Sequence, residues 1–257
     1  MLYLQFRNKT KSLLISFLIS WCIFPTQAMA LMIGTYNMPP FSMHEDGEDI
    51  GLVTEILRTL LQRSGIDDYT IINYPLARGL YELEAGRVDI YFPYIKEVHK
   101  TKDHLVLIGP IAKNRIALFV RHDYAGKVSL KDMNGLVLGA ERGSVGDIVL
   151  EKHHIHIEEA TQKISCLRMV VANRIAACAM GVLSGMYTAA INNMYDELRY
   201  TETGDYANIY VALNASLPTE IIEKIKATYE ILKKENYFEE QQRNYEKKFT
   251  VFIKSTS

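Results

Sequence analysis

Two arginines lie beside features that predict helix starts, where an arginine can bind an anion. Arg78 follows Pro75, a residue favoured at the first position of a helix. Arg142-Gly143-Ser144 precedes a second predicted helix, whose free backbone N–H groups and serine hydroxyl suit a carboxylate or phosphate. Both have structural alternatives, because Arg78 can pair with a nearby glutamate such as Glu82, and Ser144 can simply cap its helix.

Aromatic side chains gather near these arginines in the predicted order of elements. Tyr36 and Phe41 flank the Pro39-Pro40 turn and can stack on a ring or an acyl chain, or pack within their own loop. Tyr91 and Tyr94 lie at the end of a predicted strand, where alternation places one in a binding site and the other in the core. Together with the arginines, they indicate a small anionic or partly apolar organic solute.

Other chemistries find little support in the sequence. We recognise no nucleophile elbow or zinc motif, and the glycine-rich segment 139–146 (GAERGSVG) lacks the lysine of a phosphate-binding loop. His153, His154 and His156 are close in sequence, but strand alternation separates the first two, which favours a solvated surface cluster over a metal site. We therefore expect no enzyme, no cofactor and no metal.

Of the three cysteines in the sequence, Cys166 and Cys178 lie outside the first thirty residues. An oxidising compartment would allow a disulfide between them. The alternative, which the sequence favours, is two small buried apolar side chains.

The elements that must position these residues follow from hydrophobic periodicity. Apolar residues three and four apart predict helices, and short β-branched or aromatic runs predict strands. Their alternation predicts mostly parallel sheets flanked by helices, in two successive βαβα units. The expected strands are 32–35, 69–74, 88–92, 115–121, 136–140, 155–158, 175–180 and 209–213. The expected helices begin near 52, 75, 144, 161, 183, 218 and 237.

The first thirty residues resemble a secretory signal. Arg7, Lys9 and Lys11 precede the apolar run Leu13–Pro25, and Ala28-Met29-Ala30 offers small residues for cleavage after Ala30. The remaining chain carries 26 basic and 30 acidic residues, so nucleic acid is a poor candidate partner. It also has no apolar run long enough to span a membrane. We expect residues 1–30 to be a signal peptide and the mature protein to reside in the periplasm.

Several short motifs occur in order along the chain. They are Ile33-Gly34-Thr35 with Pro39-Pro40-Phe41, 51–57 (GLVTEIL), 75–80 (PLARGL) with 83–89 (LEAGRVD), 129–135 with Gly143-Ser144, and 237–248. Together they resemble the bacterial family 3 extracellular solute-binding proteins, the periplasmic receptors of ABC importers. The resemblance covers residues 31–250 and implies an α/β fold of two lobes joined by two hinge strands, with the ligand between them. It places lobe 1 at 31–118 and 207–257, and lobe 2 at 119–206.

The resemblance also implies a function. The protein would be a monomer that captures a small organic solute, anionic or amino-acid-like, for an ABC transporter or a membrane sensor. The cleft residues would come from the set Tyr36, Phe41, Arg78, Tyr91, Tyr94, Arg142 and Ser144.

The chain departs from the amino-acid-binding members at both of their charged clamps. Thr101 stands where they carry the arginine that holds the ligand carboxylate, and Gly181 stands where they carry the aspartate that holds the amine. A buried zwitterion would lack paired charges here, which is costly. Two alternatives therefore stay open: a degenerate cleft with a signalling or scaffold role, or a dehydratase-type enzyme using Glu55 or Glu141 as the acid.

Overall fold

The predicted alternation of strands and helices is present in the computed structural model, which describes residues 30–99 and 104–255. The expected signal peptide and Thr101 fall outside these residues. The strands are β1 Leu31–Thr35, β2 Met43–Glu45, β3 Glu48–Ile50, β4 Tyr69–Asn73, β5 Ile90–Ile95, β6 Leu105–Arg121, β7 Leu138–Glu141, β8 Ile157–Ala160, β9 Ala177–Gly181 and β10 Leu198–Asn214.

Helices follow most of the strands, as parallel connections require. They are α2 Leu52–Arg63, α3 Leu76–Glu84, α4 Lys96–His99, α5 Val145–Lys152, α6 Lys163–Val171, α7 Val182–Ile191, α8 Thr219–Lys234 and α9 Tyr237–Ser255, with a 3-10 turn η1 at Tyr195–Glu197. Within the described part of the chain, no helix is both long enough and apolar enough to cross a membrane.

Eight strands form one sheet in the order β4-β1-β5-β10-β6-β9-β7-β8. At one end β4, β1 and β5 are parallel, and at the other β9, β7 and β8 are parallel. We call these the first and second halves of the sheet. In open α/β sheets, ligands bind at the carboxyl ends of the parallel strands, and each half has such an end.

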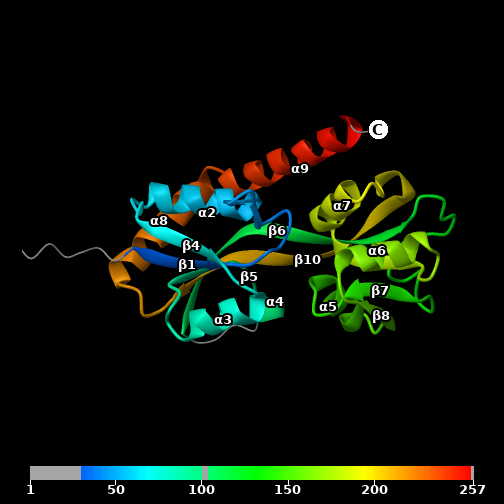
Figure 1. Cartoon of the computed structure of the whole chain (residues 1–257), viewed down its shortest axis with the longest axis horizontal. Coiled ribbons are helices and arrows are strands. Elements are labelled where there is room, and N and C mark those ends of the chain that lie inside the picture. Colours follow the sequence, from blue (N-terminus) through cyan, green and yellow to red (C-terminus); the bar gives the residue numbers. More distant parts are fainter. Residues whose placement is uncertain (1–29, 100–103, 256–257) are drawn as a thin grey trace, which may run out of the picture. The chain divides into compact units, whose positions relative to one another are not determined.

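The two halves are joined by β6 and β10, which run antiparallel to each other through the middle of the sheet (Figure 1). Their pairing is continuous from Leu198 to Glu202 and resumes at Tyr206, so the ladder is interrupted between these residues. Both strands have 17 residues, far more than the segments predicted from sequence. The structure therefore contains the two long connecting strands that a two-lobed fold needs.

Alternation along the strands builds a separate core on each face of each half. On β5, Ile90 and Phe92 pack with α2 and α8, whereas Tyr91 packs under α3. Tyr94 joins the core of Tyr91, because the pairing of β5 with β10 shifts its register between these two residues. In the second half, the core under α6 and α7 is separate from the core under α5. The same alternation appears in β9, where Cys178 and Met180 face α6 and α7.

Cys166 on α6 and Cys178 on β9 are joined by a disulfide, with their Cα atoms 5.9 Å apart. Both residues are fully buried. The favoured interpretation of the sequence, two free buried thiols, is therefore corrected. Helix α6 lies directly against β9, which brings the two cysteines within bonding distance although 12 positions separate them.

Candidate functional site

The carboxyl ends of the parallel strands from both halves surround one cavity of about 570 Å³. Loops after β1, β4, β7 and β8 contribute to its wall, together with the ends of β5 and β9 and the middle of β6. The volume suits a small organic molecule. The lining residues are Tyr36, Asn37, Met38, Asn73, Tyr74, Pro75, Leu76, Ile95, Val98, Asn114, Glu141, Arg142, Gly143, Ser144, Val145, Gly146, Thr161, Lys163, Met180, Gly181 and Ser184.

Helix α5 begins at the cavity and presents its first turn to it. Ser144 Oγ accepts a hydrogen bond from the Asp147 backbone N–H at 3.2 Å, and Asp147 Oδ2 accepts one from the Gly143 N–H at 2.7 Å. These bonds satisfy two of the N–H groups at the helix start. The N–H groups of Val145 and Gly146 have no carbonyl partner within the helix and lie in the cavity wall. They form a site suited to an anion.

Gly146 lets this first turn approach the sheet closely. A Cβ at position 146 would lie 2.1 Å from the carbonyl oxygen of Ala179 on β9. Helices α3 and α7 also begin at the cavity wall, at Leu76 and just after Gly181. Three helix N-termini thus give the cavity a positive potential, which favours an acidic ligand.

The charged side chains of the wall are paired within the protein. Lys163 Nζ lies 3.0 Å from Glu141 Oε2, and each side chain is about one quarter exposed. Arg142 pairs with Glu159, but the Arg142 side chain stays 75% exposed. A ligand carboxylate can therefore compete for Arg142 and Lys163, because both pairs remain open to solvent.

Tyr36 forms an aromatic part of the wall. Its hydroxyl donates to Met38 Sδ at 3.1 Å, and its ring stacks on Tyr91 with the centroids 6.1 Å apart. Burial, and secondarily the charge of Glu141, raises the pKa of the Tyr36 hydroxyl. The neutral phenol offers an apolar ring to a ligand.

Behind Tyr36, the buried ring of His99 contacts Tyr36 and Tyr94 edge-on, at centroid distances of 5.7 and 4.8 Å. Its Nδ1 accepts a hydrogen bond from the Ile95 N–H at 3.1 Å, so Nε2 carries the proton of the neutral ring. Burial lowers the pKa of His99 to about 4. The ring is therefore uncharged at neutral pH and serves as a packing element of the wall.

Two hydrogen bonds tie α7 to loops on the other side of the cavity. Ser184 Oγ donates to the carbonyl oxygen of Pro39 at 2.9 Å, and the Tyr187 hydroxyl donates to Glu45 Oε1 at 3.0 Å. They connect α7, in the second half of the sheet, to the segment that follows β1.

Of the candidate ligand residues, Tyr36, Arg142 and Ser144 line the cavity. Phe41 is fully buried in the core beneath α2, and Tyr91 and Tyr94 are buried in the core under α3. Their large apolar rings fill these cores, which leaves Tyr91 to support Tyr36 from behind.

Arg78 lies outside the cavity wall and pairs with Glu82 one helical turn away. Glu82 also accepts from Arg87, and this hydrogen bond is the main cause of its lowered pKa. The structure therefore contains the ion pair of Arg78 with Glu82, which was the alternative to a ligand contact.

Several wall residues escaped the sequence analysis, including Asn37, Asn73, Lys163 and Ser184. They are polar residues at the end of a strand or within two residues of it (Asn73, Asn37), or in the first turn of a helix (Lys163, Ser184). The position after a parallel strand was the available signal, but it required the strand ends to be known to within one residue.

A second cavity, of about 460 Å³, lies beside α7 and η1. It is lined by residues of α7, η1, β6 and β10, including His122, Tyr195 and Arg199. The Arg199 guanidinium donates to the carbonyl oxygen of Tyr124 at 2.7 Å. Because the parallel strand ends do not converge there, the first cavity is the stronger candidate site.

No model of a known protein family matches the sequence, and no curated protein matches it. Many solved structures share the fold. The ligand-binding core of GluR0 in complex with L-glutamate has a TM-score of 0.69 and 16% identity, covering 85% of this chain and 98% of that one. A histidine kinase sensor domain with similarity to periplasmic binding proteins has a TM-score of 0.68 and 16% identity, covering 84% and 95%.

An ancestral arginine-binding protein bound to arginine has a TM-score of 0.62 and 17% identity, covering 84% of this chain and 97% of that one. The protein therefore has the two-lobed fold of type II periplasmic binding proteins. These structural neighbours are themselves a ligand-binding core with bound L-glutamate, a sensor domain and an arginine-binding protein.

Proposed function

We propose that the protein is a periplasmic solute-binding protein that captures a small organic acid in the cavity between its lobes. The observation that carries the proposal is the convergence of three helix N-termini on one cavity at the strand ends. Helix starts bind anions through free N–H groups, and Arg142 and Lys163 add positive charge. The ring of Tyr36 supplies an apolar surface for the carbon skeleton.

The proposed lobes are residues 31–118 with 207–257, and residues 119–206. The interruption of the β6–β10 ladder between Glu202 and Tyr206 supports a hinge close to these boundaries. Ligand capture in such a fold proceeds by rotation of one lobe against the other about the connecting strands.

We place the mature protein in the periplasm, as a monomer released by cleavage after Ala30. The composition of residues 1–30 supports this location, and some of the structural neighbours are periplasmic domains. The bound solute would pass to an ABC transporter or be reported to a membrane sensor. The likeness to a histidine kinase sensor domain supports the second route.

Native mass spectrometry of the protein purified from cells tests the proposal, followed by thermal unfolding with a panel of organic acids, sugars and neutral amides. We expect a retained small acid, or stabilisation by organic acids. Lys163→Gln should weaken acid binding by roughly tenfold, about 1.4 kcal/mol, because it removes a cation from the wall. Arg168→Gln on the same helix removes the same charge outside the cavity wall and should leave binding unchanged.

Stabilisation by sugars alone would contradict the proposal, as would equal losses of affinity in Lys163→Gln and Arg168→Gln. A protein that retains no solute and gains no stability from any member of the panel would instead support a degenerate cleft with a scaffold role.

A further inference from the structure

One face of α7 contacts the opposite lobe directly. Leu183 and Ser184 on this face are buried, and Tyr187 follows one turn later. Ser184 Oγ donates to the carbonyl oxygen of Pro39 at 2.9 Å. The Tyr187 hydroxyl donates to Glu45 Oε1 at 3.0 Å, and burial followed by this hydrogen bond raises the pKa of Tyr187 to about 12, so the hydroxyl keeps its proton at neutral pH. Both acceptors follow β1 in the proposed lobe 1, whereas α7 lies in lobe 2.

The Pro39 acceptor belongs to a turn, residues 38–42, that is fixed within lobe 1. The first and last residues of the turn pair through backbone hydrogen bonds of 2.8 and 3.1 Å, and the carbonyl oxygens of Pro40 and Phe41 accept N–H groups at the start of α2. The carbonyl oxygen of Pro39 accepts from Ser184 instead. Because the turn is held by its own bonds, its pairing with α7 costs little conformational entropy.

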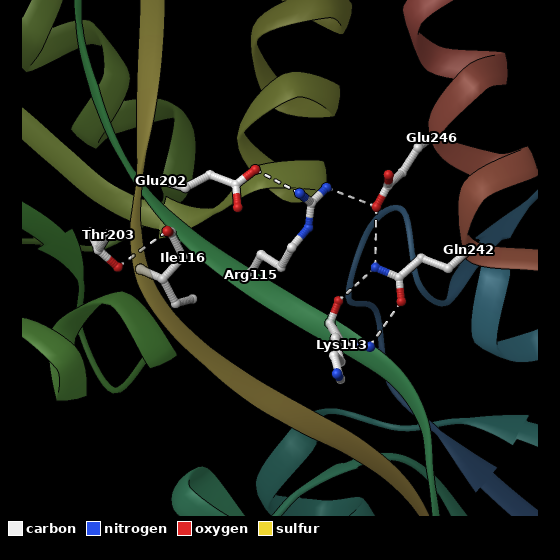
Figure 2. Close-up of polar contacts among 7 residues, drawn as sticks. All are labelled: Lys113, Arg115, Ile116, Glu202, Thr203, Gln242 and Glu246. Carbon is white, nitrogen blue, oxygen red and sulfur yellow. Dashed lines mark hydrogen bonds and ion pairs between the residues drawn. The ribbon is translucent and has the colours of Figure 1, made fainter. Parts of the chain in front are cut away.

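Helix α9 places a second element of lobe 1 beside this contact. It is tied to β6 by two side chains, Gln242 and Glu246 (Figure 2). Between them, Tyr245 is buried, and burial followed by the nearby Glu55 and Tyr187 raises its pKa to about 12. Helices α9 and α7 therefore lie against each other across the boundary between the lobes.

Apolar side chains of lobe 2 extend the contact. Leu183 on α7, with Val145 and Val149 on α5, is buried in the core cluster that is built mainly from lobe 1. Helix α5 also lies against α4 of lobe 1. Burial of this apolar surface favours the closed form whether or not a solute is bound.

We propose that α7 is a latch that holds the two lobes closed before a solute binds. Its direct bonds to lobe 1 give the closed form a stability of its own, so the solute binds to a state that the protein already populates. The strength of the latch then sets how often the cavity opens. The inference rests on the two-lobed arrangement of the proposed function, but not on the identity of the solute.

Double electron–electron resonance between spin labels on the two lobes tests the latch. Arg58→Cys on α2 and Ile191→Cys at the end of α7 provide exposed labelling sites, one on each lobe. The mature protein is unfolded in denaturant and refolded by dialysis, which removes any retained solute. We expect the distance between the labels to match the structure in most molecules.

The double variant Ser184→Ala/Tyr187→Phe removes both hydrogen bonds between the lobes. It should lower the ratio of closed to open molecules roughly tenfold, seen as a second, longer distance. Thr188→Val/Tyr195→Phe is the matched control, because it removes one aliphatic and one phenolic hydroxyl from the same lobe. Thr188 Oγ1 donates within α7, to the Ser184 carbonyl oxygen at 2.7 Å, and Tyr195 lies in the wall of the second cavity. The control should keep the wild-type distance.

Thermal unfolding verifies that each variant is folded. If Ser184→Ala/Tyr187→Phe does not fold, Tyr187→Phe alone replaces it and should give a smaller population at the longer distance. The inference is overturned if the solute-free wild type is mainly open, or if the latch variant and the control give the same distances. Because the measurement uses no solute, a molecule retained in native mass spectrometry would in both cases leave the proposed function standing.

Discussion

The side-chain amide of Gln242 on α9 hydrogen-bonds both the N–H and the C=O of Lys113, where β6 passes from one half of the sheet to the other (Figure 2). A helix near the end of the chain thus pairs with the middle of a strand in the way that another strand would. It fixes the position of the backbone on which Asn114 stands.

Replacing Gln242 by leucine removes both hydrogen bonds to Lys113. Because these bonds are partly exposed, we expect the free energy of unfolding to fall by about 1–2 kcal/mol, as measured by urea denaturation. Gln241→Leu, on the adjacent position of the same helix, serves as the control and should cause a smaller loss. Equal losses in the two variants would show that the contact with Lys113 contributes nothing specific.

His99 makes stability depend on pH. Its pKa is lowered from 6.5 to about 4 by burial, so the unfolded chain binds a proton that the folded protein does not bind between these values. The stability contributed by neutral His99 is therefore complete above about pH 6.5 and is lost as the pH falls towards 4, by about 3 kcal/mol at most.

Urea denaturation from pH 7 to pH 4 measures this loss, with His99→Gln as the reference. Glutamine keeps an acceptor for the Ile95 N–H but does not titrate in this range. We expect the pH dependence of the variant to be flatter than that of the wild type. Parallel curves for the two proteins would contradict the assignment.

The disulfide between Cys166 and Cys178 should stabilise the second half of the sheet. Closing a loop of this length in the unfolded chain is worth about 2–4 kcal/mol. The double variant Cys166→Ala/Cys178→Ala should lose this amount in urea denaturation, and reductant should lower the stability of the wild type but not that of the variant.

Thiol labelling under denaturing, non-reducing conditions provides an independent measurement for the mature protein. We expect no labelled cysteine at either position until reductant is added. Labelling of both residues without reductant would restore the interpretation of two free buried thiols.

Sequence periodicity predicted most of the elements because their signals are local. The run from Leu52 to Leu61 repeats its apolar residues every three to four positions, and α2 covers it. The two connecting strands were found only in part. Gly109-Pro110 interrupts β6 with residues typical of turns, and the first part of β10 is mostly polar because it is paired on one side only, with β6, and is largely exposed.

The candidate site was harder to predict than the fold. Residue type identified Tyr36, Arg142 and Ser144, which line the cavity. It also selected Phe41 and Tyr91, because an aromatic side chain looks the same in a sequence whether it faces a ligand or a core. Their placement depends on strand register, which is set by contacts between distant segments.

The gap in pairing between Glu202 and Tyr206 has a mechanical consequence. Thr203 donates from its hydroxyl to the carbonyl oxygen of Ile116 at 3.2 Å, and Arg115 pairs with Glu202 at 2.6 Å, so side chains bridge a stretch where backbone pairing is interrupted. Twisting the strands at this point breaks few bonds, while the paired stretches on either side resist bending. Torsion applied to the protein therefore concentrates in these few peptide units, and their amides should exchange with deuterium sooner than those of the flanking ladder.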